Sequence, residues 1–106
     1  MEKSKRIAQR KIKRLPIVFS DRNEEHQGTS SDFSSSGLFI RTRKPFSPGT
    51  IMIMVLELED NSKIPLKGVV ARTLKTRGLD LKNGMGVRLT SIPKAYEDFI
   101  QKLYQD

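Results

Sequence analysis

The sequence contains no cysteine and only one histidine, His26, among its 106 residues. Without cysteine the chain can form neither a disulfide nor a thiolate metal site. One histidine cannot complete a zinc site of the usual Cys/His kind. We therefore predict no bound metal, and we expect His26 to be a surface residue of a loop or strand rather than a ligand.

Long apolar runs are also missing. The longest is the stretch 51–56, whereas a helix that crosses a membrane needs about 20 apolar residues. The apolar residues 15–19 that follow the basic N-terminus are too few for the core of a secretory leader. We therefore expect a soluble, cytoplasmic protein without a membrane partner, and a chain of this length is sufficient for one domain.

Features that would indicate catalysis are absent as well. There is no glycine-rich phosphate-binding loop of the Walker type, and the acidic residues of the N-terminal and central regions lie in separate polar stretches rather than as an acid/base pair. The sequence therefore predicts a protein that is not an enzyme, with no catalytic residue and no cofactor.

The formal net charge is +8, which calls for an anionic partner. Residues 1–14 hold seven basic residues and one acidic residue, and so account for six of these charges. Residues 1–11 show neither the alternation of a strand nor the period of a helix, and we expect them to form a flexible basic arm.

The middle of the chain, 12–91, shows short apolar stretches separated by turn residues. The expected strands are 12–19, 26–34, 37–42, 50–59, 64–74 and 84–89. Pro16 places part of the first strand at an edge or bulge, and Gly68 is expected to form a bulge in the fifth. Strands at this spacing, with no helix among them, favour a mainly β antiparallel barrel or sandwich.

The pattern changes near the C-terminus. Tyr96, Phe99, Ile100 and Leu103 follow the i, i+3, i+4, i+7 spacing of one helical face, and Pro93 suits the first turn. We expect one amphipathic helix over 93–104, packed against the barrel, so that 1–106 forms a single domain.

A polar turn precedes the third strand. Asp32, Ser34 and Gly37 have the spacing D-x-S-x-x-G, and the turn offers a carboxylate, hydroxyls and backbone N–H groups in a small volume. We expect Gly37 to adopt a positive φ or to let a ligand approach the backbone. Such a group of donors and acceptors suits a polar, planar ligand.

The order of the motifs along the chain is similar to that of a known protein family. Arg6 and Arg10 form R-x-x-x-R, and D-x-S-x-x-G, G-L-F-I and G-M-G-V-R follow in turn. Over nearly its whole length the chain resembles the PilZ domain family of cyclic di-GMP receptors. The resemblance implies a six-stranded, Greek-key-like antiparallel β-barrel with a C-terminal helix, and cyclic di-GMP as the ligand, bound in the family manner as an intercalated dimer.

The resemblance also assigns the ligand contacts. It implies that cyclic di-GMP is bound by Arg6, Arg10, Asp32, Ser34 and Gly37, with Arg14 and Gly86 as supporting candidates. Arg10 and Arg14 have the same spacing as Arg6 and Arg10. The first pair is chosen because the residues from Lys11 to Arg14 then supply the spacer that the family has before its first core strand.

The sequence therefore predicts a receptor that orders its arm over the barrel when cyclic di-GMP binds and so signals to an unidentified partner protein. One alternative is a small basic barrel that binds RNA or DNA non-specifically, although few aromatic residues are available for base stacking. Another is a family member that has lost ligand binding and serves only as an interaction module.

Overall fold

A computed structural model describes residues 13–76 and 83–105. These residues form six strands and one helix, namely β1 (Leu15–Ser20), β2 (Glu25–Ser31), β3 (Gly37–Arg41), β4 (Ile51–Glu57), β5 (Lys63–Leu74), β6 (Gly84–Ser91) and α1 (Lys94–Leu103). The expected arm, 1–11, and the expected start of the first strand at Ile12 lie outside the described residues. Lys13 and Arg14 were also expected in the first strand, but the strand begins only at Leu15.

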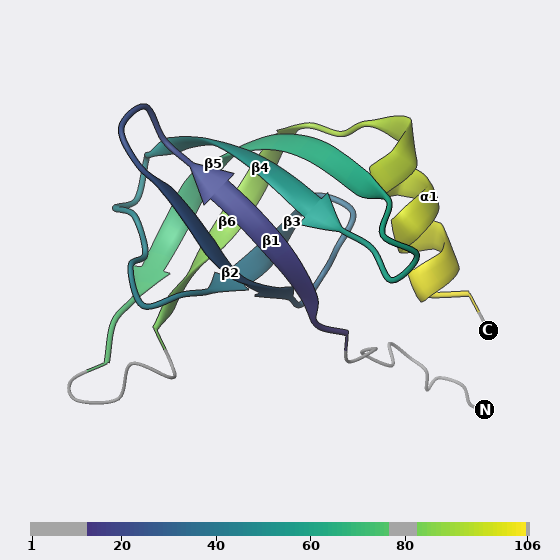
Figure 1. The fold of residues 1–106 in the computed structure, drawn as a ribbon, viewed down its shortest axis with the longest axis horizontal. Coiled ribbons are helices and arrows are strands. Elements are labelled where there is room, and N and C mark those ends of the chain that lie inside the picture. The colour runs from purple at the N-terminus through teal and green to yellow at the C-terminus, as the bar shows by residue number, and fades with distance from the viewer. Residues whose placement is uncertain (1–12, 77–82, 106) are drawn as a thin grey trace.

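The strands close into an antiparallel barrel in the order β1-β2-β3-β6-β5-β4. The chain therefore runs through three neighbouring strands and then crosses to place β4 beside β1, which is a Greek-key connection. The helix α1 lies at one end of the barrel (Figure 1). The predicted mainly β fold, a six-stranded antiparallel barrel with a C-terminal helix, is confirmed.

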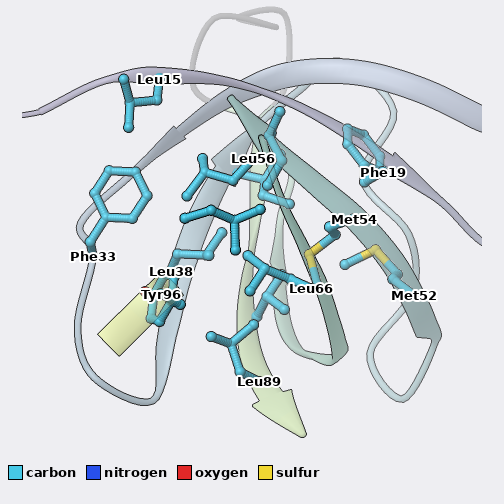
Figure 2. Close-up of a cluster of buried hydrophobic side chains, with 14 of the residues drawn as sticks. Leu15, Phe19, Phe33, Leu38, Met52, Met54, Leu56, Leu66, Leu89 and Tyr96 are labelled. Atoms are coloured by element: carbon cyan, nitrogen blue, oxygen red, sulfur yellow. The ribbon is translucent and has the colours of Figure 1, made fainter. Parts of the chain in front are cut away.

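The core follows from the alternation along each strand, because every second side chain points inward. Met52, Met54 and Met85 are fully buried, as expected for residues that fill the core. Figure 2 shows Met52 and Met54 with leucines of several strands and with Phe33 and Tyr96, which close the end of the barrel near α1. Each large side chain buried in this way contributes about 1.5–3 kcal/mol.

Two strand ends differ from expectation for a local reason. β2 stops at Ser31 instead of Ser34, because Asp32 adopts a left-handed conformation with φ 52°. β4 stops at Glu57 instead of Glu59, because Leu58 and Ser62 close a tight turn in which Asn61 has φ 71°. The β4 break leaves the apolar alternation intact, because Leu58 still packs against the core, and β2 has no apolar side chain that could mark its end, so the sequence pattern did not reveal either break.

Two expectations about Pro16 and Gly68 are confirmed, and the position of Pro93 differs by one residue. β1 pairs with β2 from its first residue but with β4 only from Ile17, so Pro16 lies where β1 has a single partner. The register of β5 against β6 shifts at Gly68. Pro93 is the N-cap of α1, one position before the first turn in which it was expected.

Two tyrosines fix α1 to the loop between β2 and β3. The hydroxyl of Tyr96, which is fully buried, donates to the backbone oxygens of Ser34 at 2.7 Å and Gly37 at 3.2 Å. The hydroxyl of Tyr104 donates to the backbone oxygen of Phe33 at 2.5 Å. The helix therefore holds three carbonyl groups of the loop that contains the D-x-S-x-x-G motif.

We expect Tyr96→Phe to lower the free energy of unfolding by about 1–3 kcal/mol, because it leaves buried carbonyl groups with one donor fewer. Urea denaturation at neutral pH measures the difference. Tyr104→Phe is the matched control and should have a smaller effect, because Tyr104 is 41% exposed and water can replace its hydroxyl. Equal losses in the two variants would contradict the role given to Tyr96.

Stability at alkaline pH should depend on the same hydroxyl. Burial, with a smaller effect of Tyr104, raises the pKa of Tyr96 well above its usual value of about 10. A tyrosine of the unfolded chain ionises near pH 10 while Tyr96 stays protonated in the fold. Its contribution to stability is therefore complete below about pH 10 and is lost as the pH rises further. Urea midpoints measured across this range should fall more steeply for the natural chain than for Tyr96→Phe, and parallel curves would refute the assignment.

Candidate functional site

A cavity of about 420 Å³ lies on the outside of the barrel, where the loop after β2 meets the outer faces of β3, β5 and β6. We call residues 32–37 the signature turn. The cavity is lined by Asp32, Ser34, Ser36, Gly37, Leu38, Phe39, Ala71, Arg72, Gly86, Val87 and Arg88. It therefore contains four of the site residues predicted from the sequence: Asp32, Ser34, Gly37 and Gly86.

The side chain and backbone of Ser34 hold the signature turn closed. The Ser34 hydroxyl accepts hydrogen bonds from the backbone N–H of Gly37 at 3.1 Å and of Ser36 at 3.4 Å. The backbone N–H of Ser34 also donates to the Gly37 carbonyl at 2.9 Å. Ser34 thus closes the turn, and the left-handed conformation of Asp32 sets the direction in which the chain enters it.

Of the two roles expected for Gly37, the positive φ is not found, and the access that it would give a ligand stays a prediction. Among the described glycines only Gly49 has a positive φ, so Gly37 is not required for a left-handed turn. A Cβ atom at Gly37 would lie 2.3 Å from the backbone oxygen of Val87. The glycine allows β6 to approach β3, and Gly37 pairs there with Arg88. Glycine is therefore required at position 37 because the backbone of β6 passes close to it.

Gly86 forms the floor of the cavity. It lies between Phe39 of β3 and Arg72 of β5 in the sheet. A Cβ atom at this position would come within 3.2 Å of Nε and 3.3 Å of Cγ of Arg72, and no backbone atom is among its three nearest contacts. The missing side chain leaves room over β6, and the Arg72 side chain borders that room.

Two arginines of the cavity were not predicted as site residues. Arg88 lies two residues after Gly86, so the alternation along β6 places it on the same face. The G-M-G-V-R motif contains this signal. Arg72 has no comparable signal, because the register between β5 and β6 shifts between Val70 and Arg72. That bulge changes the face on which the following residues lie.

The other predicted residues are not brought into this cavity by the described chain. Arg6 and Arg10 lie outside the described residues. Arg14 is exposed, precedes β1 and is not among the residues that line the cavity. His26 is half-buried in β2 and contacts the Glu24 carboxylate at 2.7 Å.

Within 13–76 and 83–105, no three His, Cys, Asp or Glu side chains gather in a way that could hold a metal ion. The single helix described there is too short to span a bilayer.

The family model of the PilZ domain matches residues 4–106. The chain belongs to the PilZ domain family. No curated protein matches it in sequence. The PilZ resemblance of the motifs is therefore confirmed at the level of the family.

Solved structures show the same fold. The inhibitor of motility MotI/DgrA from Bacillus subtilis superimposes with a TM-score of 0.69 at 20% identity, over 92% of this chain and 50% of that protein. The PilZ domain of CeSA from a cellulose-synthesizing bacterium gives 0.57 at 15% identity, over 87% and 91% of the two chains. The present chain thus spans about half the length of the first of these proteins.

The two glycines of the site should respond differently to alanine. Gly37→Ala forces the backbone of β6 to move, and we expect it to lower the free energy of unfolding by about 1–3 kcal/mol. Gly86→Ala displaces only the flexible Arg72 side chain, and we expect a change within about 0.5 kcal/mol. Urea denaturation of both variants checks this. A larger loss for Gly86→Ala than for Gly37→Ala would refute the assignment.

Proposed function

We propose that this PilZ domain is a receptor for cyclic di-GMP and binds it in the cavity beside the signature turn. The observation that supports this most is the composition of that cavity. One carboxylate, Asp32, faces the same space as two exposed arginines, Arg72 and Arg88. Acceptors and cations are both needed for a ligand that contains guanine bases and phosphodiesters.

The chemistry of the ligand matches these groups. The Watson–Crick edge of guanine presents N–H donors, which a carboxylate such as Asp32 accepts. Arginine binds guanine O6 and N7 with two N–H donors, stacks on bases and pairs with phosphate. Arg72 and Arg88 come from neighbouring strands and can serve the phosphodiesters or a base. The hollow over Gly86 gives a planar group access to the sheet.

The N-terminal arginines complete the proposed site. Arg6 and Arg10 lie roughly 13 Å apart along an extended chain and about 6 Å apart on a helical path, so the arm must curl to address one ligand. Each bidentate contact contributes about 1–3 kcal/mol, whereas ordering five residues costs about 5–10 kcal/mol. The arm alone would barely bind. The remaining free energy comes from the part of the site that is already rigid.

In this mechanism the ligand bridges two parts of the chain. The signature turn, closed by Ser34, holds one side of the ligand, and Arg6 and Arg10 close over the other, with Arg14 as a supporting contact. An intercalated ligand dimer, as in the family, would add further contacts. The ordered arm then changes the surface of the barrel that a partner protein meets.

Non-specific binding of RNA or DNA is the alternative, and the net charge of +8 favours it. The cavity offers it little support. Phe39 is the single aromatic residue in the lining of the cavity, and Asp32 would repel a phosphate backbone. We therefore rank cyclic di-GMP first.

Calorimetry of the full chain with cyclic di-GMP, GTP and single-stranded RNA tests the proposal. We expect saturable binding of cyclic di-GMP that Arg10→Ala weakens about 5- to 150-fold, which corresponds to the loss of one bidentate contact. Arg88→Ala should weaken binding in the same direction.

Arg22→Ala is the matched control. It removes the same charge from the exposed turn between β1 and β2, outside the cavity, and should leave the affinity unchanged. Binding to RNA that falls steeply with salt, without saturable binding of cyclic di-GMP, would favour the alternative function. No binding of any of the three would support a domain that has lost its ligand.

A further inference from the structure

The outer face of β4 is apolar. Met52, Met54 and Leu56 point into the core, and the residues between them point outward. These outward residues are Ile51, Ile53 and Val55, which we call the β4 stripe. Ile51 is 77% exposed and Ile53 is 57% exposed. An antiparallel strand with one solvated face normally carries polar residues there, so this composition needs an explanation.

The stripe continues onto both neighbouring strands. Ile51 lies opposite Val69 of β5, and Val55 lies opposite Pro65 of β5 and Val18 of β1. Next to Val18 and Val55 the surface is hollowed by a depression of about 440 Å³. The apolar residues are therefore contiguous, and contiguous patches with an adjoining hollow are typical of interaction sites.

One flank of the stripe is cationic. β5 carries Lys63, Lys67 and Arg72, β6 carries Arg88, and neither strand contains an acidic residue. Glu57 lies at the far end of β4, opposite Lys63. A partner that covers the stripe therefore also meets a row of positive charges. Acidic residues beside apolar ones are the complement of this surface.

The stripe is also continuous with the candidate ligand site. Ile51 lies opposite Val69, Val69 lies opposite Arg88, and Arg88 lies opposite Gly37 of the signature turn. This cross-strand row leads from the stripe to the cavity over neighbouring strands, which are spaced about 5 Å apart. A partner on the stripe would therefore reach the edge of a bound ligand.

The barrel restricts how a partner can be held. β4 is paired with β1 on one side and with β5 on the other over Ile53–Leu56, so a partner cannot add a strand there and must be recognised through side chains. Outward residues of a strand repeat about every 7 Å, and successive i, i+4 residues of a helix repeat about every 6 Å. One apolar face of a helix can therefore follow the β4 stripe.

We propose that the β4 stripe and the cationic flank of β5 and β6 form the docking surface for an acidic amphipathic helix of the partner protein. The inference rests on the proposed function, because the bound ligand would border this surface. A second copy of the chain fits less well, since β5 and β6 hold no acidic residue to meet the flank of the other copy.

A photo-reactive amino acid at position 53 of the full chain, introduced in cells, identifies the occupant. The matched control carries it at Thr29, which is exposed on the outer face of β2. We expect position 53, and not position 29, to crosslink to a protein segment that is net acidic and has apolar residues at helical spacing. A lipid or RNA adduct, a crosslink to another copy, a basic segment, or no adduct specific to position 53 would overturn the proposal.

The crosslinked segment, made as a labelled peptide, then gives the affinity. Fluorescence anisotropy with cyclic di-GMP present should show binding that Ile53→Lys weakens at least about tenfold and Thr29→Lys leaves unchanged. Equal affinities of the two variants would overturn the proposal. Calorimetry with cyclic di-GMP separates the two inferences. If cyclic di-GMP binds but no acidic segment docks, this inference alone fails. If a segment docks but cyclic di-GMP does not bind, the proposed function fails.

Discussion

The hydroxyl of Tyr96 joins the C-terminal helix to the backbone of the signature turn, and the geometry of the candidate site depends on this contact. It donates to the carbonyl groups at Ser34 and Gly37, while the Ser34 side chain closes the same turn from within. A loop fixed on two sides loses little further entropy when a ligand binds. The candidate site is therefore rigid on the side of the turn, and the proposed ordering of the arm would need such a rigid counterpart.

The D-x-S-x-x-G motif combines structural and ligand-facing residues. Gly37 is required by the approach of β6 and Ser34 by the closure of the turn, so both would be needed even without a ligand. Asp32 faces the cavity but also sets the path of the chain with its left-handed φ. A chain could thus keep the motif for its fold alone. The arginines at positions 72 and 88 have no such structural reason, and they are the better indicators of an anionic ligand.

Alternation and helical period were sufficient to predict the strands, the helix and the core, because each depends on which face of an element is buried. The end of β2 was not predictable in this way, since β2 has no apolar side chain whose pattern could show where the strand stops at the left-handed Asp32. The Asp32, Ser34 and Gly37 set came from the family resemblance. Arg88 was within reach of the sequence, because it follows Gly86 by two residues on the same face of β6. Arg72 required the bulge in β5, which is a fact of register that a single sequence does not contain.

The distribution of charge indicates whether a bound ligand would strengthen or weaken the docking of an acidic helix on the β4 stripe. If it binds in the cavity as proposed, cyclic di-GMP would bring negative phosphodiesters next to Arg88 and by itself would weaken the attraction of the flank for an acidic partner. If the arm, residues 1–11, folds over the ligand as proposed, its five basic residues and one acidic residue bring four net positive charges, which more than offset the phosphodiester charges of one cyclic di-GMP. Lys63 and Lys67 lie on β5 toward the stripe and keep their charge in either state. Ligand and acidic helix would therefore bind cooperatively, and by linkage the partner would raise the affinity for cyclic di-GMP by the same factor.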